Sequence, residues 1–132
     1  MPQLDWDELI FLEFLGVEPM VDDYSTSHTY EVEHNELRLL LTLWQYESVI
    51  HLSLFRKATT VPLFSFASFV RGGIRLVNDK RGKYLELMDC IVGPTRFWYI
   101  QAGDLFDREK YAHGITVQVE IRPEIRIALE PA

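Results

Sequence analysis

HTYEVEHNELRLLLTLWQYESVIHLSLF, residues 28–55, is the stretch that decides the fold of this chain. Apolar and polar residues alternate through much of it, which is typical of β-strands that bury one face. Polar turns at residues 33–36 and 45–48 divide the stretch into three segments. The stretch therefore predicts a three-stranded antiparallel meander.

The two turns also predict which residues pair across the strands. The first turn places Val32 opposite Leu37, Glu31 opposite Arg38, Tyr30 opposite Leu39 and His28 opposite Leu41. The second places Leu43 opposite Ile50, Leu41 opposite Leu52 and Leu39 opposite Leu54. Both registers leave one aliphatic face and one face of mixed character. This mixed face comprises Glu31, Arg38, Leu40, Thr42, Trp44, Val49, His51, Ser53 and Phe55.

The histidines and glutamates at the start of the stretch suggest a metal or acid/base site. On a strand, however, His28 and His34 lie about 20 Å apart, too far to share one metal ion. Glu31 and Glu33 share a face about 7 Å apart, but Arg38 is the expected charge partner of Glu31. We therefore predict no metal site and no catalytic residues here.

The mixed face is too apolar for solvent and too polar for the centre of a core. Either the N-terminal helix or a second sheet covers part of it, or it is an interaction surface. Its candidate binding residues are Glu31, Arg38, Trp44, His51 and Phe55.

The rest of the chain extends the antiparallel pattern. Residues 4–16 predict a helix with Asp5 as N-cap, Leu4 packed against Leu9, and Gly16 at its end. Residues 74–89 predict a hairpin that pairs Arg75 with Glu86, Leu76 with Leu85 and Ile74 with Leu87. Further strands are expected at 62–70, 95–101 and the C-terminus, and a short helix near 104–113. The fold class is then α+β, mostly antiparallel β with about eight strands, as a sandwich or half-barrel in one domain, residues 1–132.

Charge is distributed unevenly along the chain, whose net charge is −7. Residues 1–47 contain eleven acidic residues and one basic residue, Arg38, whereas the remainder contains nine acidic and twelve basic residues. This asymmetry favours a basic partner at the N-terminal surface and argues against nucleic acid.

Cys90 is the only cysteine, which excludes an intramolecular disulfide and fits a reducing cytoplasm. No stretch approaches the roughly 20 apolar residues of a membrane span, and the acidic N-terminus is unlike a signal peptide. We expect a cytoplasmic protein that does not bind a membrane.

The sequence contains no nucleophile, phosphate-binding or zinc motif, and Cys90 is expected to be a small buried hydrophobe. We predict a non-enzymatic protein-binding module without cofactor, of an inhibitor, immunity-like or accessory kind. The alternative is a small-molecule-binding protein or enzyme, with a pocket between sheet and helices that includes His51. A homodimer through residues 124–129 or the mixed face is compatible with both hypotheses.

Overall fold

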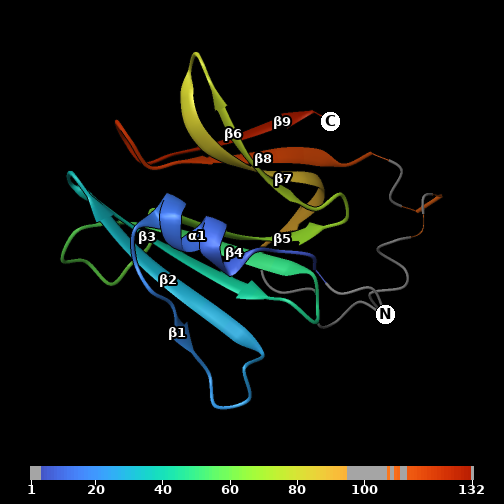
Figure 1. Ribbon diagram of the computed structural model, residues 1–132, viewed down its shortest axis with the longest axis horizontal. Helices are drawn as coiled ribbons and strands as arrows, with labels where there is room; N and C mark the ends of the chain where they lie inside the picture. The colour runs from blue at the N-terminus through green and yellow to red at the C-terminus, as the bar shows by residue number, and fades with distance from the viewer. Residues whose placement is uncertain (1–3, 95–106, 108, 111–112, 132) are drawn as a thin grey trace.

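The computed structural model describes residues 4–94, 107, 109–110 and 113–131, shown in colour in Figure 1. This part of the chain contains one helix and nine strands, and all strand pairs are antiparallel. The elements are α1 (Glu8–Leu15), β1 (Met20–Val21), β2 (Ser27–His34), β3 (Leu37–Trp44), β4 (Val49–Arg56), β5 (Phe64–Val70), β6 (Ile74–Asp79), β7 (Gly82–Gly93), β8 (Ile115–Glu120) and β9 (Arg126–Pro131). The predicted α+β class with an N-terminal helix is confirmed.

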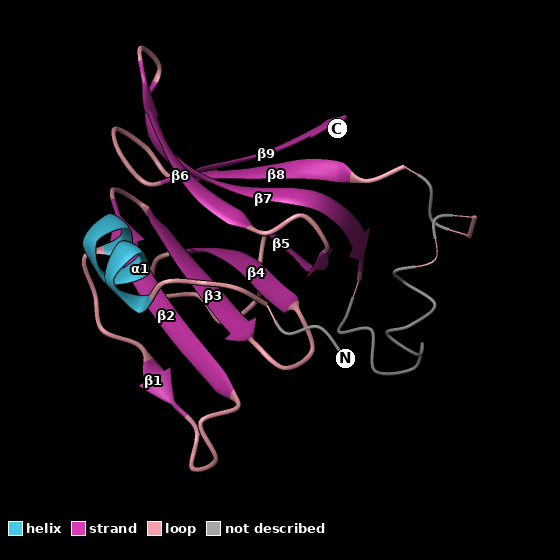
Figure 2. Ribbon diagram, turned by 45° about the vertical axis from the view of Figure 1, so that its right-hand side comes forward, coloured by secondary structure: helices cyan, strands magenta, loops and turns pink. Residues whose placement is uncertain are grey.

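A single sheet runs in the order β1-β2-β3-β4-β5-β7-β8-β9, and β6 also pairs with β7. The first half of β7 pairs with β6 and its last residues pair with β5, along the same edge. Between these halves the register with β8 shifts at Leu87/Cys90, and Asp89 has a positive φ of 55°. The sheet bends there, so that β1–β5 and β6–β9 form two parts that face each other (Figures 1 and 2).

Arg71 stabilises this bend. Its guanidinium lies 2.8 Å from Asp89 Oδ1, and its side chain is only 1% exposed. The turn that follows Arg71 passes close to β7. The amide of Gly72 donates a hydrogen bond to Met88 O at 2.8 Å. A Cβ at position 72 would lie 2.9 Å from that oxygen, so only glycine fits without a shift.

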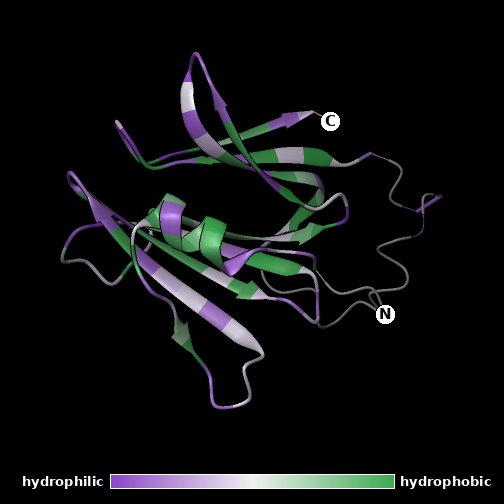
Figure 3. Ribbon diagram, in the orientation of Figure 1, coloured by the Kyte–Doolittle hydropathy of each residue, from purple (hydrophilic) through white to green (hydrophobic). Residues whose placement is uncertain are grey.

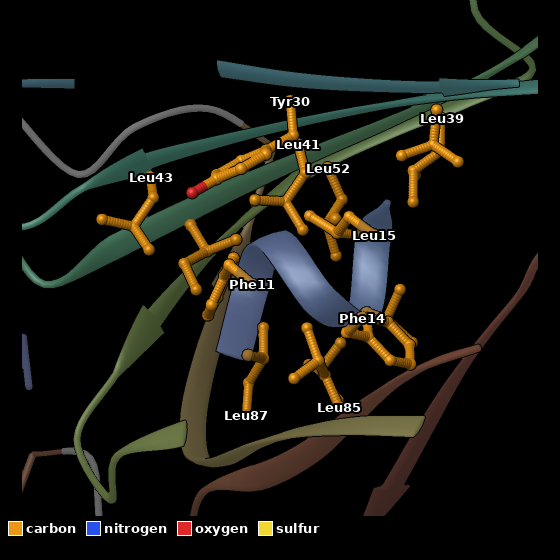
Figure 4. Close-up of a cluster of buried hydrophobic side chains, with 14 of the residues drawn as sticks. Phe11, Phe14, Leu15, Tyr30, Leu39, Leu41, Leu43, Leu52, Leu85 and Leu87 are labelled. Carbon is orange, nitrogen blue, oxygen red and sulfur yellow. The ribbon is translucent and has the colours of Figure 1, made fainter. Parts of the chain in front are cut away.

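Helix α1 occupies the concave side between the two parts of the sheet (Figure 4). Phe11, Phe14 and Leu15 are buried in a cluster with strand residues from both parts, among them Leu41 and Leu85. Hydrophobic residues are concentrated on α1 and the inner strands, and the hairpin tips are polar (Figure 3). The helix thus fills the half-barrel, and its burial links the two parts of the sheet.

The helix begins later than predicted. Asp7, not Asp5, is the N-cap, and its side chain accepts a hydrogen bond from the amide of Leu9. The predicted contact between Leu4 and Leu9 is also wrong, because Leu4 is buried and Leu9 is 73% exposed. The cause is tertiary: the amide of Leu4 donates to Gln45 O, which holds the chain outside the helix until Glu8. Gly16 ends the helix with φ 74°, as expected.

The first meander has the predicted strands, but one of its two registers differs. Its first turn is centred on Asn35 and Glu36, so Val32 pairs with Leu39 and not with Leu37. Asn35 has φ 56°, a conformation that asparagine tolerates better than most residues. The shift is two residues, so each side chain keeps its predicted face. Tyr30 and Val32 are accordingly buried.

The other predicted registers are confirmed. Leu43 pairs with Ile50 across the second turn, and the pairs of the 74–89 hairpin are also as expected. The predicted strand at 95–101 lies outside the described residues. So does most of the predicted helix at 104–113, and its described residues Asp107, Glu109, Lys110 and His113 are not helical. Asp107 instead closes a local turn by accepting from the amide of Glu109.

Candidate functional site

The mixed face lies on the side of the meander opposite α1. Helix α1 packs against Tyr30, Leu41 and their neighbours on the concave side, so it does not cover the mixed face. Of the two expected covers, the N-terminal helix or a second sheet, the helix is therefore excluded. Burial nevertheless varies along this face, from exposed Glu31 to Val49, which is 2% exposed.

One of the five predicted binding residues, Arg38, contacts two of the others. Arg38 forms an ion pair with Glu31 at 3.4 Å, and its guanidinium carbon lies 4.2 Å from the centroid of the Phe55 ring. Arg38 also donates to Thr59 O at 2.9 Å. The ion pair is diagonal, because Arg38 stands directly opposite Glu33 in the sheet. These three contacts engage the Arg38 head group, and Phe55 beneath it is buried.

The other two predicted binding residues form a second cluster. The rings of Trp44 and His51 meet edge to face, with centroids 6.5 Å apart. A hydrogen bond of 3.0 Å joins His51 Nε2 to Ser65 Oγ, which in turn lies 2.8 Å from Ser53 Oγ. Burial lowers the pKa of His51 from its ordinary value, because it disfavours the charged imidazolium. The cluster connects β4 to β5 by side-chain hydrogen bonds.

The acidic N-terminal residues line a groove that the sequence did not reveal. It lies between the start of α1 and strand β6 and has a volume of about 410 Å³. Its residues, here called the acidic groove, are Asp5, Trp6, Asp7, Glu8, Ile10, Phe11, Ile74, Arg75 and Leu76. About sixty residues of chain separate its two walls, so no local motif could indicate it.

Trp6 is held firmly in the wall of the acidic groove. Its indole N–H donates to Gln45 Oε1 at 2.8 Å. Its ring meets Phe11 and His28 edge to face, with centroid distances of 5.3 and 4.7 Å. His28 is buried, and its Nε2 lies 3.7 Å from Glu8 Oε1. His28 therefore packs behind the groove wall.

The charges of the groove do not cancel. Arg75 donates two hydrogen bonds to Glu86 Oε1, at 3.2 and 3.0 Å, and so is already neutralised. The carboxylates of Asp5, Asp7 and Glu8 remain, and all three residues are exposed. The groove therefore presents an excess of negative charge beside apolar walls.

Two smaller grooves are also formed by described residues. One, of about 370 Å³, includes Asp22, Trp44 and Glu47, and the other, of about 240 Å³, includes His34 and Glu124. His51 lines none of these three grooves, so they lend no support to a small-molecule pocket built around it. His34 instead contacts Pro123 O through Nε2 at 2.8 Å.

Other candidate chemistry is weak in the described part of the chain. Burial raises the pKa of the Cys90 thiol to about 12, which suits a buried structural residue. Among the described residues, no group of three or more His, Cys, Asp or Glu side chains is placed to hold a metal ion. Within the same residues, no helix is long and apolar enough to span a membrane.

Comparisons with known proteins identify the fold. No protein-family model and no curated protein sequence matches the chain. A solved structure matches with a TM-score of 0.72 at 16% sequence identity, over 99% of this chain and 98% of the other. It is a chain of a contact-dependent growth inhibition toxin–immunity protein complex from Klebsiella pneumoniae 342. At this identity the likeness shows that the two chains share one fold.

Proposed function

We propose that this protein is a binding module of the immunity type, which binds a protein toxin and holds it inactive. The observation that carries the proposal is the full-length fold match to a chain of a toxin–immunity protein complex. The net charge of −7 favours the immunity role over the toxin role, because it suits a protein that binds a basic partner. The protein would bind the toxin in the cytoplasm, where cysteines such as the lone Cys90 stay reduced.

The acidic N-terminal surface is the preferred contact surface. Its carboxylates at Asp5 and Glu8 are exposed. A cationic side chain of a partner could therefore pair with them while breaking few existing contacts of the folded protein. The Arg38 cluster is different, since Glu31, Phe55 and Thr59 already surround the guanidinium. A partner that binds Arg38 would first have to break these contacts within the protein.

The mixed face remains the second candidate surface, with Glu31, Arg38, Trp44, His51 and Phe55 as its proposed binding residues. Trp44 and His51 favour it most, because both are half-buried and a flat aromatic surface suits protein interfaces. Self-association through β9 is a further proposal, motivated by the exposure of Leu129 at 51%. Sedimentation velocity would distinguish a dimer from a monomer.

Salt-dependent capture tests the proposed function. Tagged protein is incubated at low ionic strength with lysate of the source cells, and bound proteins are eluted with salt and identified. We expect a stoichiometric basic partner whose binding weakens as salt rises, because exposed charges are screened. If no protein binds at stoichiometric amounts at low salt, the binding hypothesis loses its main support.

A further inference from the structure

We propose that the acidic groove is a docking site for an arginine side chain of the basic partner. This inference rests on the proposed function for the identity of the partner, but the groove itself can be tested without one.

Charge complementarity is the first argument for arginine. The groove carries three carboxylates, from Asp5, Asp7 and Glu8, while its own cation is paired with Glu86. Asp7 uses Oδ1 to cap the helix through the amide of Leu9. The Glu8 side chain is 73% exposed, and its ion-pair contact with His28 is long, at 3.7 Å. A guanidinium entering the groove would therefore meet two exposed carboxylates, of Asp5 and Glu8, neither of which caps the helix.

The apolar walls are the second argument. Ile74 and Leu76 of β6 and Ile10 of α1 are half-buried and line the groove. They would pack against the aliphatic part of a long side chain, as such stems commonly do on apolar surfaces. A groove of about 410 Å³ also lies within the range of small-ligand sites, about 300–1,000 Å³, so it admits a whole side chain.

Trp6 favours arginine over lysine. The planar guanidinium is less strongly hydrated than an ammonium group and stacks on aromatic rings. Trp6 is already fixed by its hydrogen bond to Gln45 and by its contacts with Phe11 and His28. Binding would therefore cost little conformational entropy on the groove side. Lysine would find the same carboxylates but would gain less from the ring.

The test uses capped tripeptides and nuclear magnetic resonance. Uniformly ¹⁵N-labelled protein is titrated at low salt with acetyl-Gly-Arg-Gly-amide, and the indole N–H signal of Trp6 is followed. The controls are the same peptide with citrulline, which is neutral and nearly isosteric, and with lysine. We expect the arginine peptide to shift the Trp6 signal saturably, the lysine peptide to bind more weakly, and the citrulline peptide to have almost no effect.

Two double variants test whether the effect belongs to the groove. Asp5→Asn with Glu8→Gln should raise the dissociation constant roughly three- to tenfold, since each exposed ion pair contributes a fraction of 1 kcal/mol. Asp7 is left unchanged because it caps α1. The control, Asp23→Asn with Glu36→Gln, changes the net charge equally at exposed positions outside the groove and should leave binding unchanged.

The outcomes are distinct. A Trp6 signal that does not respond to arginine, or that responds equally to lysine, overturns the arginine site. So does a control double variant that weakens binding as much as the groove variant. Capture of a toxin partner with an unresponsive groove would refute this inference and leave the proposed function intact. A responsive groove in a protein without a toxin partner would support the inference and refute the proposed function.

Discussion

Phe11→Ala is the sharpest test of the role of α1. Phe11 is 1% exposed and lies between the two parts of the bent sheet. Its ring contacts Trp6 edge to face at 5.3 Å and Tyr30 at 5.6 Å. If the helix links the two parts through this side chain, its removal must weaken the whole domain.

The expected magnitude follows from burial. Replacing a buried phenylalanine with alanine costs about 3–5 kcal/mol in total, which includes the lost ring contacts. We expect a loss of about 4 kcal/mol, a large part of the roughly 5–15 kcal/mol that stabilises a domain. Leu9→Ala on the same helix is the control. Leu9 is 73% exposed, so we expect a change of no more than about 0.5 kcal/mol.

Urea unfolding followed by tryptophan fluorescence measures both variants. The slopes against urea should match that of the wild type, so that the midpoints report stability. A difference between Phe11→Ala and Leu9→Ala of less than about 1 kcal/mol would refute the reasoning. It would mean that the sheet holds its bend without the helix.

Three further predictions concern individual side chains. Burial lowers the pKa of His51 below its ordinary value, so the unfolded chain binds the proton more readily than the folded protein does. The free energy of unfolding, measured by urea titration at each pH, should therefore fall as the pH is lowered from about 7.5 to 5.5. His51→Gln should make the free energy of unfolding depend less on pH. Burial raises the pKa of the Cys90 thiol to about 12, so it should not react with Ellman's reagent at neutral pH in the folded protein. It should react fully in denaturant. Rapid labelling of the folded protein would contradict the buried position of Cys90. Arg71→Ala removes the partner of Asp89, a side chain that is only 1% exposed, and should lower the free energy of unfolding by about 3 kcal/mol or more in thermal or urea unfolding. The control Arg126→Ala removes a side chain that is 61% exposed and should lower it by less than about 1 kcal/mol. Equal losses of stability would argue against a structural role of Arg71 at the bend.

Much of the fold could be predicted because its hairpins are local. Alternation determines which face each residue takes, so Tyr30 and Val32 were assigned correctly even though the turn at Asn35 moved the register by two residues. The bend at Asp89 and the start of α1 could not be predicted in the same way. Both depend on contacts with distant residues, those of Arg71 and Gln45.

The candidate site was harder to predict for the same reason. The mixed face follows from strand periodicity, so the sequence brought Trp44 and His51 together correctly. The ion pair between Arg38 and Glu31 was also expected, although its diagonal geometry was not. The acidic groove needs β6 to lie beside α1, and only the excess of acidic residues near the N-terminus hinted at it.

Growth rescue tests the proposed function most directly. The basic protein captured by this chain is expressed alone and together with this chain in a sensitive host, and growth is compared. The account predicts arrest by the partner alone, restored growth on co-expression, and weaker rescue with the Asp5→Asn and Glu8→Gln variant. A captured partner that does not impair growth, or an arrest that this chain does not relieve, would contradict the immunity role.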